Sequence, residues 1–221
     1  MYRFLIFIFF ISFPFVNIAQ SIKGGLTAGF NATQVDGDEV YGYHKYGLNV
    51  GALAIIPFGK KFSASIETIY NQKGSYQRPR FNDSLSGEYK LILNYLEVPV
   101  LFNYTDKDVI KFGVGFSWGR LVQFKEWQHG NRINWSTPYG PYKNSDVDVL
   151  IDVQFKLFTG LYFDFRDAYS VAKIRTREFE IKATGQKWTR KQFNNDITFR
   201  FVYVFKDAPS VKAKKKVKEV K

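Results

Sequence analysis

Residues 110–119 read Ile-Lys-Phe-Gly-Val-Gly-Phe-Ser-Trp-Gly, and every second residue of this stretch is large and apolar. The residues between them are small or polar, so the two faces of the segment differ in chemistry. Because side chains alternate across a strand with a period of two, this pattern predicts a β-strand with one apolar face. Alternation alone does not say whether that face points into a core or outward.

The same alternation recurs along the chain. The odd-numbered residues from Val147 to Leu157 are apolar, and so are those from Ile197 to Phe205. We predict eight strands, at roughly 23–33, 44–57, 61–74, 88–104, 108–124, 147–163, 168–181 and 192–205. In the fourth, the apolar phase changes near Asn94–Leu96. This change predicts a bulge, and Pro99 then needs a position without a ladder hydrogen bond.

The connections between the predicted strands alternate in length. The short ones are Pro57–Lys60, Thr105–Asp108 and Asp164–Asp167. The long, polar ones are Gln34–Tyr43, Ser75–Gly87, Lys125–Asp146 and Lys182–Lys191. Short periplasmic turns and long extracellular loops are typical of an up-and-down transmembrane β-barrel, and an even strand count would place both termini in the periplasm.

The polar face favours a membrane barrel over a soluble, lipocalin-like one. An eight-stranded barrel has an interior just wide enough for side chains, which suits glycines such as Gly113 and opposed charges such as Asp152 with Lys156 or Arg200. We expect the interior to hold Glu67, Glu97, Lys111, Asp148, Asp152, Lys156 and Arg200. We expect an interfacial aromatic girdle at Tyr70, Tyr104, Trp118, Tyr162, Tyr203 and Phe205. The interior charges could form a solute or proton path, but a salt-bridge network that fills the lumen is favoured.

Both ends of the chain differ from the barrel, which we assign to residues 21–206. Residues 1–20 begin with Met-Tyr-Arg and a short apolar run, which predicts a signal peptide and export to the outer membrane of a Gram-negative bacterium. Residues 207–221 form a tail whose last part carries six lysines against one acid, Glu219. Its expected contacts are anionic lipid or an acidic partner, through Lys212, Lys214, Lys215, Lys216 and Lys218.

Composition and charge exclude several classes of protein. The 221 residues contain no cysteine, so disulfide frameworks and thiolate zinc sites are excluded. A mean hydropathy of −0.24 and the lack of a second long apolar run exclude a helical membrane bundle. Although the net charge is +12, nucleic acid is not an expected partner of an exported barrel.

The longest loop and the two histidines are the remaining candidates for a site. The loop 125–146 holds Trp127, Trp135, Tyr139 and Tyr142, which predict either a docking surface for a protein or glycan or a cap over the barrel mouth. His44 and His129 have no carboxylate at a metal-ligand spacing, and nothing ties either to a nucleophile. We therefore expect no catalytic residue, no metal and no cofactor.

Two segments resemble the PorT-like outer membrane protein β-barrel family of Bacteroidota. They are Ser65–Gly74, which reads SIETIYNQKG, and Tyr95–Phe102, which reads YLEVPVLF; the aromatic closing strand Asn195–Phe205 also fits. The resemblance implies an outer-membrane barrel that serves as an accessory subunit of machinery such as type IX secretion or barrel assembly. Its expected partners are outer-membrane lipid, lipopolysaccharide and other envelope proteins. A narrow porin-like channel and an envelope-lipid-modifying enzyme are the alternatives.

Overall fold

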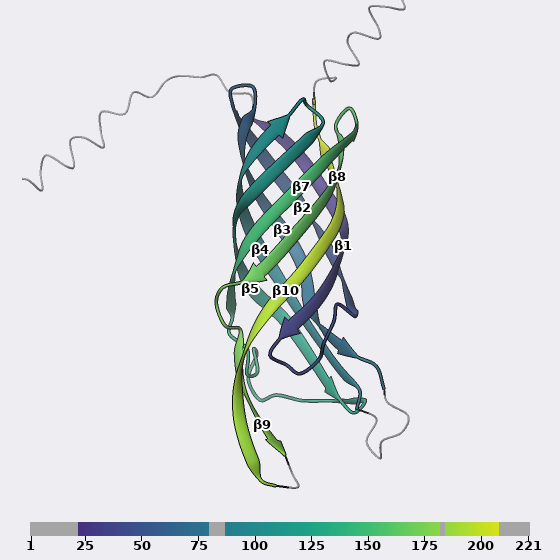
Figure 1. Cartoon of the computed structure of the whole chain (residues 1–221), viewed down its shortest axis with the longest axis vertical. Coiled ribbons are helices and arrows are strands. Elements are labelled where there is room, and N and C mark those ends of the chain that lie inside the picture. Colours follow the sequence, from purple (N-terminus) through teal and green to yellow (C-terminus); the bar gives the residue numbers. More distant parts are fainter. Residues whose placement is uncertain (1–21, 80–86, 182–183, 208–221) are drawn as a thin grey trace, which may run out of the picture.

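The computed structural model describes residues 22–79, 87–181 and 184–207, and these residues form one antiparallel ring of strands. The strands are β1 (Lys23–Asp36), β2 (Lys45–Phe58), β3 (Phe62–Gln77), β4 (Tyr89–Asp106), β5 (Ile110–Gln128), β6 (Asn131–Arg132), β7 (Ser145–Phe158), β8 (Leu161–Ser170), β9 (Arg175–Ile181) and β10 (Gln186–Val204). The ring follows the order β1-β2-β3-β4-β5-β7-β8-β10, and β10 closes it by pairing with β1 (Figure 1). The prediction of an eight-stranded antiparallel barrel is confirmed.

The predicted signal peptide, residues 1–20, lies outside the described residues. The lysines of the predicted tail lie outside them as well, and of that tail only Asp207 is described. Within the described ranges, no helix has the length and apolar character needed to cross a membrane.

The two ends of the barrel differ as the sequence predicts. Short turns join β2 to β3, β4 to β5 and β7 to β8, and they lie at the end where β1 begins and β10 ends, at the top of Figure 1. We call this the terminal end. At the opposite end, which we call the loop end, the connections are longer. There β9 and the first part of β10 form a hairpin that projects beyond the ring (Figure 1).

One predicted turn is wrong. Residues 164–167 lie within β8, and the turn that follows β7 is at Thr159 and Gly160, where Gly160 has a φ of 82°. The register shifts between Lys156 and Phe158, so a bulge sits beside this two-residue turn. A two-residue turn by itself would move the outward side chains from odd positions in β7 to even positions in β8. The extra residue at the bulge reverses this shift, so the outward side chains stay at odd positions. The apolar residues therefore stay at odd positions on both sides of Phe158, Thr159 and Gly160, and 147–163 is predicted as one strand.

The predicted strand 168–181 and the predicted loop 182–191 are also corrected. Residues 168–170 end β8, whereas β9 stands outside the ring and pairs only with β10. Lys187, Arg190 and Lys191 belong to β10, and Lys182 lies outside the described residues. The ring still has eight members because β7 and β8 are two strands where one was predicted.

The bulge predicted in β4 is confirmed. The register between β4 and β5 shifts between Asn94 and Tyr95. Between β3 and β4, pairing stops at Ile66 opposite Val100 and resumes at Ile69 opposite Glu97. Pro99 lies in this gap, where its missing N–H leaves no ladder bond unmade.

The apolar face of the strands points outward. The exposed apolar side chains include Leu26, Phe30, Leu48, Ile66, Val100, Phe102, Phe112, Val114, Phe116, Ile151, Phe155 and Phe201. The inward face is polar and charged at mid-height, with an apolar cluster toward each end. In the predicted girdle, Trp118 and Tyr203 are about half exposed, but Tyr162 packs inward against the cluster at the terminal end and is a correction.

Candidate functional site

The centre of the lumen is crossed by a buried ionic layer, the central layer, made of Glu67, Asp152, Asp164, Arg166 and Arg200. Arg166 donates from Nη2 to Oε1 of Glu67 at 2.8 Å, and Arg200 donates from Nη1 to Oε2 at 2.9 Å. Glu67 stands on β3 and the two arginines stand on β8 and β10, so these contacts span the lumen. All three side chains are almost fully buried.

Two aspartates complete the central layer. Nε of Arg166 donates to Asp152 at 2.6 Å, and Nε of Arg200 donates to Asp164 at 2.7 Å. Each guanidinium is thus held by two carboxylates, which fixes its plane. A buried charge is tolerated only when it is paired and hydrogen-bonded, and this layer meets that condition for both arginines.

A second layer lies nearer the loop end and surrounds one ammonium group. We call it the lysine layer: Lys73, Glu97, Asp146, Asp148 and Asp196. Nζ of Lys73 is 2.6 Å from Asp148, 2.9 Å from Glu97, 3.4 Å from Asp196 and 3.6 Å from Asp146. Four carboxylates from three other strands therefore converge on a side chain of β3. This layer fills a second cross-section of the lumen.

The structure brings together only part of the predicted interior network. Glu67, Asp152 and Arg200 meet in the central layer, and Glu97 and Asp148 meet in the lysine layer. Lys111 and Lys156 join neither. Lys156 instead contacts Asp207 at 2.6 Å, and Nζ of Lys111 lies 5.0 Å from the centre of the Tyr162 ring.

Five members of the two layers were missed by the sequence analysis. Asp164 and Arg166 lie in the segment that the sequence predicts as a turn. The others are Lys73, Asp146 and Asp196. Residues an even number of positions apart on a strand share a face, and this rule predicts two of these five. Lys73 lies six residues from Glu67, and Asp196 lies four residues from Arg200.

A third layer, which is largely apolar, lies inside the barrel at the loop end. Its buried members are Val35, Val40, Tyr89, Leu91, Leu93, Tyr95, Leu121, Tyr142 and Ile174. At its rim Glu126 accepts hydrogen bonds from Tyr89 at 2.9 Å, Arg175 at 3.1 Å and Trp135 at 3.2 Å. Near this rim, burial raises the pKa of Asp38 to about 6, although Ser75 and the backbone N–H of Val40 donate to it.

Two of the four aromatic residues predicted for the long loop, Tyr139 and Tyr142, pack against this apolar layer, as the capping alternative expects. Tyr142 is only 5% exposed within the apolar layer, so it does not belong to an accessible docking surface. Tyr139 is half-buried and packs against the same layer. Trp127 lies in β5 and not in the predicted loop, and it is half-buried with Lys90 over its ring. Trp135 is 40% exposed.

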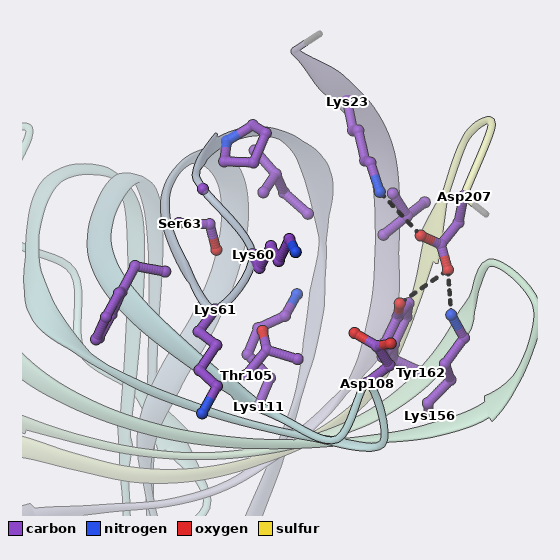
Figure 2. Close-up of a pocket in the computed structure, with 15 residues that line it drawn as sticks. Lys23, Lys60, Lys61, Ser63, Thr105, Asp108, Lys111, Lys156, Tyr162 and Asp207 are labelled. Atoms are coloured by element: carbon purple, nitrogen blue, oxygen red, sulfur yellow. Dashed lines mark hydrogen bonds and ion pairs between the residues drawn. The ribbon is translucent and has the colours of Figure 1, made fainter. Parts of the chain in front are cut away.

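The terminal end opens into a pocket of about 220 Å³ lined by lysines (Figure 2). On one side Asp207 holds Lys23 at 3.0 Å and Lys156 at 2.6 Å, and it accepts a hydrogen bond from Tyr162 at 2.9 Å. These contacts bind the last described residue to the barrel wall. Among the described residues, no group of three or more His, Asp or Glu side chains is arranged to hold a metal ion.

Comparisons with known proteins agree with the geometry. A family model described as outer membrane protein beta-barrel domain matches residues 18–175. Neisserial surface protein A has a similar structure, with a TM-score of 0.52 and 10% identity over 81% of this chain and 96% of that chain. The attachment invasion locus protein of Yersinia pestis, solved with the heparin analogue sucrose octasulfate, gives a TM-score of 0.47 and 11% identity over 83% and 99%. No curated protein sequence matches significantly.

Proposed function

This chain belongs to the outer membrane protein beta-barrel domain family, and from that premise we propose that it is a closed-lumen barrel acting as a non-catalytic accessory subunit. In this role it binds other envelope components through its surfaces and passes no solute through its centre. From the resemblance to the PorT-like family, we propose that the protein serves in outer-membrane machinery such as type IX secretion or barrel assembly.

The observation that carries this proposal is the occupation of the lumen. The contact of Glu67 with both Arg166 and Arg200 blocks the centre. The lysine layer and the apolar layer around Tyr142 then fill successive levels toward the loop end. An eight-stranded barrel has little interior space beyond its own side chains, so these three layers support a closed lumen.

Two surfaces support a binding role. The outward apolar band suits outer-membrane lipid. The hairpin of β9 and β10 projects at the loop end, where Phe179 stacks on Trp188 with ring centres 5.7 Å apart. Short turns are typical of the periplasmic side, so we place the terminal end and the lysine-rich tail in the periplasm and the hairpin toward lipopolysaccharide.

Single-channel recording in planar bilayers tests the closed lumen. We expect the purified full-length protein to give no stable open level across the physiological range of voltages. A reproducible open level would contradict the proposal and would favour a narrow porin-like channel. An envelope-lipid-modifying activity that disappears in a His129→Ala variant would contradict its non-catalytic part.

Affinity capture from solubilised envelopes tests the accessory role. The full chain is compared with a chain truncated after Asp207, which keeps the contacts of that residue with Lys23 and Lys156. We expect a discrete envelope protein to co-purify with the full chain. If the truncated chain no longer captures this envelope protein, the binding site is in the tail, at Lys212, Lys214, Lys215, Lys216 and Lys218. If the truncated chain still captures it, the binding site is on the barrel. If neither form captures an envelope protein, the accessory role is wrong.

A further inference from the structure

The pocket at the terminal end concentrates positive charge from separate parts of the chain. Five lysines line it: Lys23, Lys60, Lys61, Lys111 and Lys156 (Figure 2). They come from the start of β1, the β2–β3 turn, the start of β5 and the end of β7. Ring closure therefore assembles this group of charges, which no single segment of the sequence contains.

The acids of the pocket do not balance these lysines. Asp207 is engaged by Lys23 and Lys156, and Asp108 is the other carboxylate that lines the cavity. Among the described residues, no carboxylate lies within 4.0 Å of the ammonium groups of Lys60, Lys61 or Lys111. Lys60 and Lys111 thus line the cavity with no carboxylate of the described residues within 4.0 Å of their ammonium groups, whereas the ammonium of Lys61 lies 5.8 Å from the centre of the Tyr104 ring.

The burial of Lys111 increases the free-energy cost of this charge imbalance. It is half-buried beneath the rim of the pocket, beside the ring of Tyr162. A partly buried ammonium group loses hydration, and an anion that enters the pocket restores favourable interactions. Ser63 and Thr105 also line the cavity and bring hydroxyl groups that can donate to an oxyanion.

We propose that this pocket is a binding site for a phosphate-bearing anion. Its volume of about 220 Å³ lies below the range typical of drug-sized ligands, but it is ample for a phosphate group with a short substituent. Lysine binds phosphate as a mobile point charge, and several lysines around one cavity suit a tetrahedral oxyanion. The phosphate can belong to an anionic phospholipid headgroup or to a soluble phosphate compound. This site is independent of whether the barrel serves as an accessory subunit.

Two binding measurements on the full-length protein in neutral detergent or nanodiscs test the proposal. Inorganic phosphate is titrated calorimetrically at constant ionic strength, with chloride as the competing anion. In parallel, nanodiscs of phosphatidylcholine alone are compared with nanodiscs that also contain phosphatidylglycerol, and the retained lipid is read by native mass spectrometry. Saturable binding of phosphate supports a soluble source, and selective retention of phosphatidylglycerol supports a headgroup.

Variants decide whether binding occurs in this pocket. Lys111→Gln and the double variant Lys60→Gln/Lys61→Gln are each expected to weaken binding by roughly tenfold. The double variant changes only exposed side chains, so it keeps the test valid if Lys111→Gln does not fold. Lys187→Gln is the matched control, because Lys187 is an exposed lysine of the loop-end hairpin. The proposal is overturned if neither probe binds saturably, or if Lys187→Gln weakens binding as much as the pocket variants.

Discussion

Arg200 and Glu67 are separated by 133 residues in the sequence, yet Nη1 of Arg200 lies 2.9 Å from Oε2 of Glu67 in the middle of the barrel. The contact joins β10 to β3 across the lumen instead of along a shared sheet edge. It is one of two guanidinium contacts on the same carboxylate. The pairing of both buried arginines across the lumen therefore depends on one side chain of β3.

Replacing Glu67 by Gln should destabilise the barrel strongly. The substitution leaves the guanidinium groups of Arg166 and Arg200 buried with less compensating charge, and breaking a buried pair in this way typically costs about 3–5 kcal/mol. Urea unfolding in detergent, followed by tryptophan fluorescence, measures the change. Glu178→Gln is the control, because Glu178 is 59% exposed in its side chain and pairs with Lys187 at the surface. A similar effect of both variants would contradict the role assigned to Glu67.

Replacing Gly29 by Ala should also destabilise the ring, because the backbone of β10 leaves no room for a side chain there. A Cβ at Gly29 would lie 2.2 Å from the carbonyl oxygen of Phe199. Overpacking of this kind typically costs about 1–3 kcal/mol. Gly24→Ala on the same strand is the matched control, since its Cβ would meet only the Phe205 ring at 3.5 Å. Equal unfolding midpoints for the two variants would show that β1 and β10 separate more easily than this packing implies.

Tyr142→Ala should release the long loop from the barrel mouth. Tyr142 is buried in the apolar layer and accepts a hydrogen bond from Arg175 at 2.8 Å, so its removal takes away the main anchor of the loop. Limited trypsin digestion should then cut faster after Lys143, as read by mass spectrometry of the fragments. Tyr41→Ala is the control, because Tyr41 is 80% exposed. Unchanged cleavage in Tyr142→Ala would show that other contacts hold the loop.

Asp38 should make stability depend on pH between about 4 and 6. Burial raises the pKa of Asp38 in the folded state to about 6, above its ordinary value of 3.8. A carboxyl whose folded pKa is raised contributes stability below its unfolded pKa and loses that contribution as the pH rises through the folded pKa. The stability advantage of the wild type over Asp38→Asn should therefore be larger at pH 4 than at pH 7, by roughly 3 kcal/mol at most. Equal differences at the two pH values would contradict a raised pKa.

The sequence alone predicts an antiparallel barrel, the outward apolar face, the bulge in β4 and the separation of short turns from long loops. These features are local, because a period of two reports which residues share a face and a polar interruption reports where a strand ends. The same local rule explains the error at β7 and β8. The bulge beside Gly160 keeps the outward residues of β7 and β8 at odd positions, so the phase of the alternation does not show that the chain reverses there.

Only the tertiary structure decides which charges meet. Face parity predicts that Glu67 and Arg200 point inward, but it does not predict that Lys73 meets four carboxylates or that Lys156 meets Asp207. Ring closure brings opposite walls of a narrow lumen within the reach of side chains, whatever their separation in the sequence. The height of each residue along the barrel then depends on the register of every intervening strand pair. Partners across the lumen, and the group of lysines at the terminal end, are therefore set by the accumulated register of eight strands and not by any local pattern.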